Sequence, residues 1–465
     1  MNKGTSAVEG VRGKMSTPLS SPAISPTNIR RVAILFSGGP APAANAVIAS
    51  AGICFSRAGI EVLGLLNGYA NLAKFDPTKG LKEGSDFIRL HHKDLEGMRT
   101  QPGILIGTSR ENPGKNVKTE ADLANENATA PLRRVYDALR SQEVDALISI
   151  GGDDTLTTAA KFKLFQDRNP QIGPRIRIVH LPKTIDNDYE GIDFTFGYFT
   201  AVEMLAREVR NLLADAQAAR AWYVVQVMGR KAAWLTYGAA IAGEAQLAIG
   251  LEDIPDDWWC EEEAISPQTG EVMRDSAGKP VMRKILRIEK VVDRIVQMVR
   301  VRFAEGKPYG VVVIAEGLAE FLPAEEIKKC IPEDQFRALK PDPFGHFPVS
   351  QLNFAPRLGR LVAERVKQEL GKELKITGLQ FGYEIRCHPA TAFDVCLGSQ
   401  LGVGAYRALV EKGLDGVMVS VTGQFELVYK PFETLMDMTT LRAKARLVQP
   451  GSDFHQLARY LETRV

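Results

Sequence analysis

One local pattern recurs along most of this sequence: a short apolar, β-branched run, a glycine-rich turn, and then a helical stretch. The first example is "RVAILFS", which is followed by "GGPAPAAN" and by helical periodicity over 43–57. Similar apolar runs are "VDALISI", "RIRIVHL", "AWYVVQVM", "YGVVVIAEG" and "KITGLQFGYE", and helical stretches lie between them at 201–216, 288–302 and 356–370. Strands that alternate with helices predict parallel sheets of the α/β class, covered by helices on both faces.

Length and composition narrow the class of protein further. The chain has 465 residues, which is more than one hydrophobic core normally serves, so we expect at least two domains. Its net charge is only +2, which argues against a nucleic-acid or membrane-surface partner. No run approaches the ~20 apolar residues of a membrane span. The segment 1–29 is rich in Ser, Pro and Gly, and we expect a disordered tail there.

The cysteines indicate the cellular compartment. There are five, which is an odd number, and no C-x-x-C spacing occurs. This speaks against a disulfide framework or a structural zinc site and suits a reducing cytosol, so we expect a cytoplasmic protein.

In α/β folds, ligands bind at the carboxyl ends of strands, so the residues that follow each strand are the candidates for ligand binding. After the first strand, Gly38 and Gly39 can let backbone N–H groups approach a phosphate. Such a turn often carries two glycines for steric reasons alone. Arg110, at the end of "GILIGTSR", is suited to clamp a phosphate or to lie on the surface.

Two adjacent carboxylates follow the next glycine turn, in "ISIGGDDTLTTA" over 148–159. Asp153 and Asp154 stand where an anionic ligand is expected. One interpretation is a Mg²⁺ site, because this ion takes oxygen ligands and bridges phosphates. The other is that the two acids cap a helix that begins at Thr155 and interact with its dipole.

The segment "HLPKTIDNDYEG", 180–191, has the densest polar cluster. Lys183, Thr184, Asp186 and Asp188 crowd together after a buried strand. Carboxylates packed this closely are costly unless they meet a cation or a substrate. One of them can serve as a general base while another serves a metal.

Further polar residues follow later strands. Arg230 in "VMGRKAA" and Arg386 in "GYEIRCHP" are forked donors suited to a sugar phosphate, and Glu316 is suited to a sugar hydroxyl. Each alone can be explained as a surface ion-pair residue, and their shared position after strands supports the functional interpretation. The acidic and then Gly/Pro-rich stretch 256–284 reads as an insertion, either a hairpin lid or a surface excursion.

These segments, in this order, resemble the phosphofructokinase family from about Arg30 to the end of the chain. The matching motifs are "SGG-x-AP-x-x-N", "GTSR", "GGDD", "PKTIDND", "MGR", "EG" and "GYEIR". The resemblance implies two Rossmann-like parallel-sheet domains with the active site in the cleft between them. We expect a phosphoryl-donor domain over 30–198 completed by 385–440, a fructose 6-phosphate domain over 199–384, and a helical tail over 441–465.

The resemblance also implies a role for each matching residue. Asp186 would take the proton from the 1-hydroxyl of fructose 6-phosphate, and Asp153 and Asp188 would serve Mg²⁺. Gly38, Gly39 and Arg110 would contact the donor. Thr184 would contact the sugar, and Ile185 would belong to the same substrate site. The sugar phosphate would be held by Met228, Gly229, Arg230, Glu316, Tyr383 and Arg386, together with Arg220 of a neighbouring subunit in a homodimer or homotetramer.

Two positions bear on the choice of donor. Members of the family that use ATP carry motifs similar to "GGDG" and "PGTIDND". This sequence has Asp154 in place of the last glycine of the first motif and Lys183 in place of the glycine of the second, as pyrophosphate-using members do. Asp154 would repel and crowd the α-phosphate of a nucleotide, and we expect it to orient Lys183. Lys183 would stabilise the transferring phosphoryl and the leaving phosphate.

The expected reaction therefore makes fructose 1,6-bisphosphate and phosphate from fructose 6-phosphate and pyrophosphate, with Mg²⁺, reversibly. One alternative keeps the family and changes the donor to ATP or a polyphosphate. Another is a non-catalytic regulatory subunit, which the intact Asp153, Asp186 and Asp188 disfavour. A dinucleotide-binding oxidoreductase is disfavoured because no G-x-G-x-x-G follows the first strand. The sequence also departs from many relatives at Ala43, where they carry a glycine.

Overall fold

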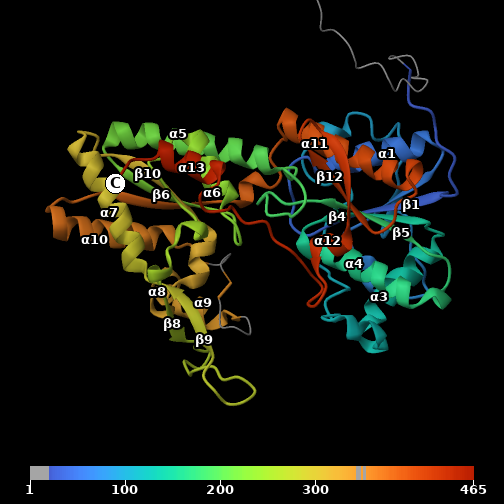
Figure 1. Cartoon of the computed structure of the whole chain (residues 1–465), viewed down its shortest axis with the longest axis horizontal. Coiled ribbons are helices and arrows are strands. Elements are labelled where there is room, and N and C mark those ends of the chain that lie inside the picture. The colour runs from blue at the N-terminus through green and yellow to red at the C-terminus, as the bar shows by residue number, and fades with distance from the viewer. Residues whose placement is uncertain (1–19, 342–346, 349–351) are drawn as a thin grey trace, which may run out of the picture.

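The computed structural model describes residues 20–341, 347–348 and 352–465, so most of the expected N-terminal tail lies outside the described residues. Two lobes lie side by side, each built around its own sheet (Figure 1). This is the predicted α/β class with two parallel-sheet units, and the prediction is confirmed. Among the described residues, no helix combines the length and apolar character needed to cross a membrane.

The first lobe is built on a seven-stranded sheet with the order β13-β12-β5-β4-β1-β2-β3. The inner strands pair in parallel, whereas the edge strands β3 and β13 run antiparallel to their neighbours. The strands are β1 (Arg31–Ser37), β2 (Glu61–Leu65), β3 (Phe87–Arg89), β4 (Ala146–Gly151), β5 (Arg177–Pro182), β12 (Val417–Thr422) and β13 (Glu426–Pro431).

Helices cover both faces of this sheet (Figure 1). α1 and α11 pack closely together on one face, and α3 and α4 lie on the other. Every residue of β4 is buried, as expected for a central parallel strand between two helical layers. The helices are α1 (Ala44–Arg57), α2 (Ala70–Ala73), α3 (Glu126–Ser141), α4 (Asp153–Arg168), α11 (Ala392–Tyr406) and α12 (Phe432–Leu435).

The second lobe is built on a four-stranded parallel sheet with the order β11-β6-β10-β7. Its strands are β6 (Trp222–Val227), β7 (Leu247–Ile249), β10 (Gly310–Ala315) and β11 (Ile376–Phe381). Its helices are α5 (Tyr198–Ala219), α6 (Trp234–Gly243), α7 (Ile288–Ala304), α8 (Ala324–Cys330), α9 (Glu333–Ala338) and α10 (Ala355–Leu370). The three long helices expected at 201–216, 288–302 and 356–370 are thus confirmed.

The stretch that was expected to be an insertion forms the antiparallel hairpin of β8 (Trp259–Glu263) and β9 (Met282–Leu286), which projects from the second lobe (Figure 1). The C-terminal stretch pairs β14 (Met436–Asp437) with β15 (Arg442–Ala443) and then crosses to the second lobe, where α13 (Asp453–Leu461) packs against α6. It therefore connects the two lobes.

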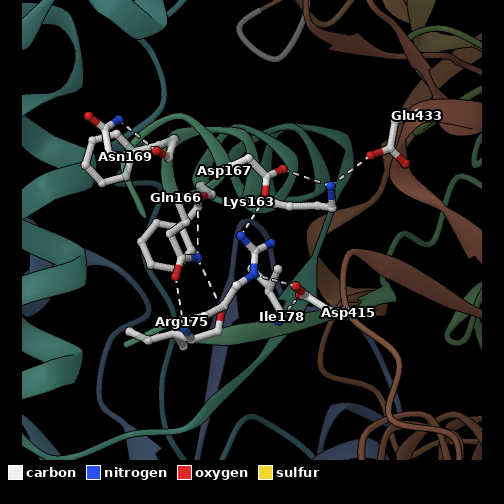
Figure 2. Close-up of polar contacts among 11 residues, drawn as sticks. Lys163, Gln166, Asp167, Asn169, Arg175, Ile178, Asp415 and Glu433 are labelled. Atoms are coloured by element: carbon white, nitrogen blue, oxygen red, sulfur yellow. Dashed lines mark hydrogen bonds and ion pairs between the residues drawn. The ribbon is translucent and has the colours of Figure 1, made fainter. Parts of the chain in front are cut away.

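A polar network fixes α4 against β5 (Figure 2). The side-chain amide of Gln166 donates to the carbonyl of Ile176 (3.1 Å) and accepts from its N–H (2.9 Å). Arg175 ion-pairs with Asp167 on the helix and with Asp415 before β12, the latter at 2.7 Å. Because α4 begins directly after the glycine turn and β5 ends at Pro182, just before Lys183, this anchoring helps to set the spacing of the two segments that carry the acidic residues.

Candidate active site

A cavity of about 300 Å³ opens where the carboxyl ends of strands from both sheets meet. Residues that follow β1, β4 and β5 line it from the first lobe, and residues that follow β6, β10 and β11 line it from the second. The residues singled out from the sequence that line the cavity are Gly38, Gly39, Arg110, Asp153, Asp154, Lys183, Thr184, Ile185, Asp186, Asp188, Met228, Glu316 and Arg386.

The turn after β1 is tied to the loop that carries Arg110. The N–H of Gly38 donates to the carbonyl of Ser109 (2.8 Å), and Thr108 Oγ1 donates to the carbonyl of Gly38 (2.7 Å). Gly38 has φ +91°, and a Cβ at this position would lie 3.3 Å from Lys183 Nζ. Glycine is therefore needed both for the backbone conformation and for the approach of the lysine.

Ala43, five residues further on, lies at a backbone position that favours glycine. Its φ is +65°, in the left-handed region, and it is the N-cap residue of α1. A residue with a Cβ is strained there, whereas glycine is not.

Asp153 and Asp154 form the first turn of α4. The N-cap residue is Gly152, and no side chain caps the helix, so the prediction that the two acids cap a helix beginning at Thr155 is wrong. Both acids lie in the first turn, where their charge is favourable to the helix dipole, as the same interpretation expected. Asp153 Oδ1 accepts the N–H of Asp154 (2.8 Å). Desolvation and the adjacent charge of Asp153 raise the pKa of Asp154, and the charge of Lys231 opposes this shift.

The loop after β5 is held in shape by its own polar groups. Thr184 Oγ1 accepts the N–H of Asp186 (3.0 Å), and Thr195 Oγ1 donates to the carbonyl of Thr184 (2.7 Å). Asn187 is fully buried at φ +55°, and its Oδ1 accepts the N–H of Thr195 (3.0 Å). This conformation presents Asp186 and Asp188, on either side of Asn187, to the cavity.

The charges in this loop are strongly perturbed. Burial lowers the pKa of Lys183 to about 8, although the charge of Asp186 counteracts part of the shift. Burial also raises the pKa of Asp186, and the neighbouring carboxylates of Asp188 and Glu316 raise it further. A buried lysine beside a carboxylate of raised pKa is a common arrangement at sites of proton and phosphoryl transfer.

One expected contact is absent. Among the described residues, no hydrogen bond or ion pair joins Asp154 to Lys183; the ammonium of Lys183 lies against Gly38 instead. The expectation that Asp154 orients Lys183 is therefore wrong for this structure. Any influence of Asp154 on donor choice must act through its own charge and volume.

Some of the expected sugar-phosphate residues line the cavity and others do not. Arg386 lies in it, with its guanidinium 4.7 Å from the ring centre of Tyr383. Arg230 is exposed and pairs with Glu320 at 2.8 Å. The expected residues outside the cavity lining are Gly229, Arg230, Tyr383 and Arg220, the last of which is exposed at the end of α5.

The structure also brings in residues that sequence reasoning missed. Lys231, directly after the "MGR" motif, pairs with Asp153 from the opposite lobe. Arg446, in the C-terminal segment, donates from Nη2 of its side chain to the carbonyl of Asn187 (2.8 Å). The backbone N–H of Arg446 donates to the carbonyl of Asp188 (2.8 Å). The position of Lys231 beside a basic motif was a usable signal, whereas nothing in the sequence around Arg446 indicates a contact with a loop more than 250 residues away.

Asp153 and Asp188 form a donor set that fits a hard divalent cation. After burial, the charge of Asp153 is the next cause of the raised pKa of Asp188, so the two carboxylates act on each other. In the described part of the chain, no group of three or more His, Cys, Asp or Glu side chains is placed to hold a metal. Mg²⁺ commonly binds one or two carboxylates and completes its shell with water and substrate phosphates, so two carboxylates suffice.

Comparison with known proteins identifies the family. A family model described as "Phosphofructokinase" matches residues 31–262. A pyrophosphate–fructose 6-phosphate 1-phosphotransferase of Naegleria fowleri is 30% identical over 96% of this chain and 90% of the relative. The chain belongs to the phosphofructokinase family. Enzymes of this family are phosphotransferases and use a divalent metal.

Other members of the phosphofructokinase family match with different donor names. A pyrophosphate–fructose 6-phosphate 1-phosphotransferase of Thermotoga maritima is 32% identical, covering 92% of this chain and 89% of the relative. An ATP-dependent 6-phosphofructokinase of Spirochaeta thermophila is 29% identical, covering 84% of this chain and 87% of the relative. A crystal structure of a pyrophosphate-dependent phosphofructokinase from Marinobacter aquaeolei shares the fold, with a TM-score of 0.58 at 17% identity over 94% of this chain and 92% of the other.

Proposed function

We propose that this chain is a pyrophosphate-dependent 6-phosphofructokinase, which transfers a phosphoryl group from pyrophosphate to the 1-hydroxyl of fructose 6-phosphate. The observation that carries the proposal is the pair Asp154 and Lys183. Both residues line the cavity, and they stand at the two positions where ATP-using members of the family carry glycine. Identity to relatives does not separate the donors, because pyrophosphate-named and ATP-named relatives match at similar levels.

Asp154 disfavours a nucleotide by charge and by volume. Its carboxylate lies in the first turn of α4, beside Asp153, in the lining of the cavity. We propose that a donor longer than pyrophosphate would extend to this carboxylate. A phosphate placed against two adjacent carboxylates meets like charge, which costs affinity. Pyrophosphate is shorter and ends before it reaches this point, so Asp154 discriminates between the donors without touching the smaller one.

Lys183 supplies fixed positive charge at the transfer point. Its side chain is buried and its ammonium lies against the Gly38 turn, which lines the cavity. A preorganised cation in a partly desolvated site stabilises the charge that develops on the transferring and leaving phosphates. Its lowered pKa of about 8 leaves it mostly protonated near pH 7.

Asp186 serves as the general base. Its raised pKa keeps it basic enough to take the proton from the 1-hydroxyl as the new O–P bond forms and the bridging P–O bond of pyrophosphate breaks. The products are fructose 1,6-bisphosphate, inorganic phosphate and a proton on Asp186. Asp153 and Asp188 would hold Mg²⁺, which neutralises charge on the donor phosphates. Glu316 and Met228 face the same cavity from the second lobe, and Arg386 faces it from the segment after β11, where the chain returns to the first lobe. These three residues would hold the sugar phosphate.

The two lobes would then bind different substrates. We propose that the first lobe, over 30–198 and 385–440, binds the donor and that the second lobe, over 199–384, binds the sugar. Arg220 is exposed at the end of α5, away from this chain's own cavity, which is consistent with a contribution to a neighbouring subunit of a homodimer or homotetramer. We place the enzyme in the cytoplasm, in glycolysis and gluconeogenesis.

The test is a coupled assay on the purified protein with fructose 6-phosphate, Mg²⁺ and either pyrophosphate or ATP. The proposal predicts turnover with pyrophosphate and little with ATP. It also predicts that fructose 1,6-bisphosphate and phosphate yield pyrophosphate in the reverse direction. Turnover with ATP alone would support the ATP-dependent alternative, and no turnover with any donor would support a regulatory subunit.

A further inference from the structure

An ion pair joins the two lobes at Asp153, one of the residues that line the cavity. Lys231 follows β6 in the second lobe, and its Nζ lies 2.5 Å from Oδ2 of Asp153, the first residue of α4 in the first lobe. The other oxygen of Asp153 accepts the N–H of Asp154. Both carboxylate oxygens of Asp153 therefore have partners, and a metal cation that binds Oδ2 competes with the ammonium of Lys231 for the same negative charge.

We infer that Lys231 is an exchangeable counter-ion, which neutralises Asp153 in the absence of metal and moves to the donor phosphates when metal and donor bind. The inference deepens the proposed function, on which it rests, by adding a donor-binding residue from the sugar-binding lobe. It also couples the arrival of the donor to a contact between the lobes.

Charge explains why a cation is needed at this place. Asp153, Asp154 and Asp188 all line the cavity, and the charge of Asp153 raises the pKa of both other carboxyl groups, so the three repel each other when nothing neutralises them. Lys231 is the cation that reaches Asp153 at ion-pair distance among the described residues. When a divalent ion takes over this role, the ammonium is released beside the anionic donor that comes with the ion.

Exposure explains why Lys231, rather than Lys183, is suited to move. The side chain of Lys231 is 47% exposed and has a flexible four-carbon stem, so it can turn without repacking its surroundings. Lys183 is 7% exposed and is confined against the Gly38 turn. The two lysines would therefore act differently, one as a fixed charge at the transfer point and the other as a mobile charge.

The first arm of the test measures metal binding without any phosphate compound. Mn²⁺ binding to the free enzyme is followed by the electron paramagnetic resonance signal of unbound Mn²⁺. Lys231→Met should bind Mn²⁺ roughly fivefold more tightly than wild type, which is the equilibrium effect of removing a half-exposed competing ion pair. Lys231→Arg, which keeps the charge, should stay within twofold of wild type. Unchanged or weaker Mn²⁺ binding by Lys231→Met would overturn the inference.

Lys328→Met is the matched control, because it removes an exposed Lys–Glu pair of similar length (2.6 Å) in the same lobe, outside the cavity lining. Its Mn²⁺ affinity and its kinetic constants should equal those of wild type. A change in Mn²⁺ affinity as large as that of Lys231→Met would show a non-specific charge effect and would also overturn the inference.

The second arm measures steady-state kinetics with saturating Mg²⁺. Lys231→Met should raise KM for the donor by about tenfold, as expected for the loss of a charge-assisted hydrogen bond, and leave KM for fructose 6-phosphate within about twofold. An unchanged donor KM would overturn the transfer of Lys231 to the donor. A wrong proposal for the donor can be told apart from a wrong inference about Lys231. The Mn²⁺ measurement contains no donor, so its result does not depend on which donor the enzyme uses. If the enzyme prefers ATP, the kinetic measurement can be made with ATP.

Discussion

The guanidinium of Arg446 donates a 2.8 Å hydrogen bond from Nη2 to the carbonyl of Asn187, the residue between Asp186 and Asp188. The same guanidinium donates from Nη1 to the carbonyl of Ile192 and lies 4.9 Å from the ring centre of Trp234, at the start of α6. Arg446 therefore holds the acidic loop of the first lobe and contacts the second lobe. The C-terminal segment therefore helps to hold the acidic loop of the site in its conformation.

Replacing Arg446 should impair catalysis more than substrate binding. Arg446→Met removes two charge-assisted hydrogen bonds to loop carbonyls, which should lower the free energy of unfolding by about 2 kcal/mol or more. It should also let Asp186 and Asp188 shift, and small displacements of reacting groups can cost about 10²-fold in kcat. Steady-state kinetics at a temperature well below the measured Tm would separate the two effects. A kcat equal to that of wild type would contradict a positioning role.

The fold could be predicted from the sequence to a large extent, because its signals are local. Apolar runs that end at glycine or, for β5, at Pro182 predicted β1, β4, β5, β6, β10 and β11 with the helices between them. The strands β2, β3, β7, β12 and β13 of the two sheets were not predicted. β7, for example, has three residues and is specified by its pairing with β10, which no local pattern encodes.

Prediction of the site was uneven for a physical reason. The residues directly after the strands, such as Asp153, Lys183 and Asp186, share a cavity because parallel strands bring their carboxyl ends to one edge. Arg446 reaches the same loop by a tertiary contact between distant segments. The partners of Arg230 and Lys183 also depend on which rotamer each side chain adopts, and the sequence does not specify that.

Asp186 should control the acid limb of the pH profile. A general base works only when it is deprotonated, so kcat/KM should fall as pH falls through its pKa. Burial and the nearby carboxylates raise this pKa, so the fall should occur well above the usual pKa of about 3.9 for aspartate. Asp186→Asn should lose roughly 10²–10⁴-fold in kcat. Turnover of the variant within a few-fold of wild type would assign the base to another residue.

Arg386 and Arg230 should differ in their effect on the sugar substrate. Arg386 lies in the cavity, and its loss in Arg386→Met should raise KM for fructose 6-phosphate about tenfold or more, the usual effect of losing a hydrogen bond to a charged group. Arg230→Met should raise it less, because Arg230 must first leave Glu320 to reach a phosphate. Because the guanidinium of Arg386 also lies next to Gly39, a larger rise in the donor KM than in the sugar KM for Arg386→Met would assign Arg386 to the donor.

His180 is a buried, neutral link beneath the glycine turn. Tyr189 Oη donates to the carbonyl of Gly151 (3.0 Å) and so accepts from His180 Nε2 (2.9 Å), which leaves His180 Nδ1 to accept from Ser149 Oγ (3.3 Å). Burial lowers the pKa of His180 from 6.5 to about 3. A proton on His180 would break this chain next to the turn that precedes Asp153.

This histidine predicts how stability depends on pH. Because its pKa is lower in the folded than in the unfolded chain, its contribution is complete above pH 6.5 and is lost as pH falls from 6.5 toward 3. The loss is about 1.4 kcal/mol for each pH unit in that range. His180→Gln should have a lower Tm at pH 7.5 but a shallower decline of Tm between pH 6.5 and 5. Parallel declines in the two proteins would contradict a neutral buried His180.

The most direct test of the central claim compares donors in wild type and in Asp154→Gly. The ratio of kcat/KM for pyrophosphate to kcat/KM for ATP should be high in wild type. It should fall in Asp154→Gly, because the repulsion is removed and space for an α-phosphate opens. Adding Lys183→Gly should lower it further by cutting kcat with pyrophosphate, which needs the lysine charge in the transition state. A wild-type ratio that favours ATP, or a ratio unchanged by Asp154→Gly, would contradict the assignment of donor choice to Asp154.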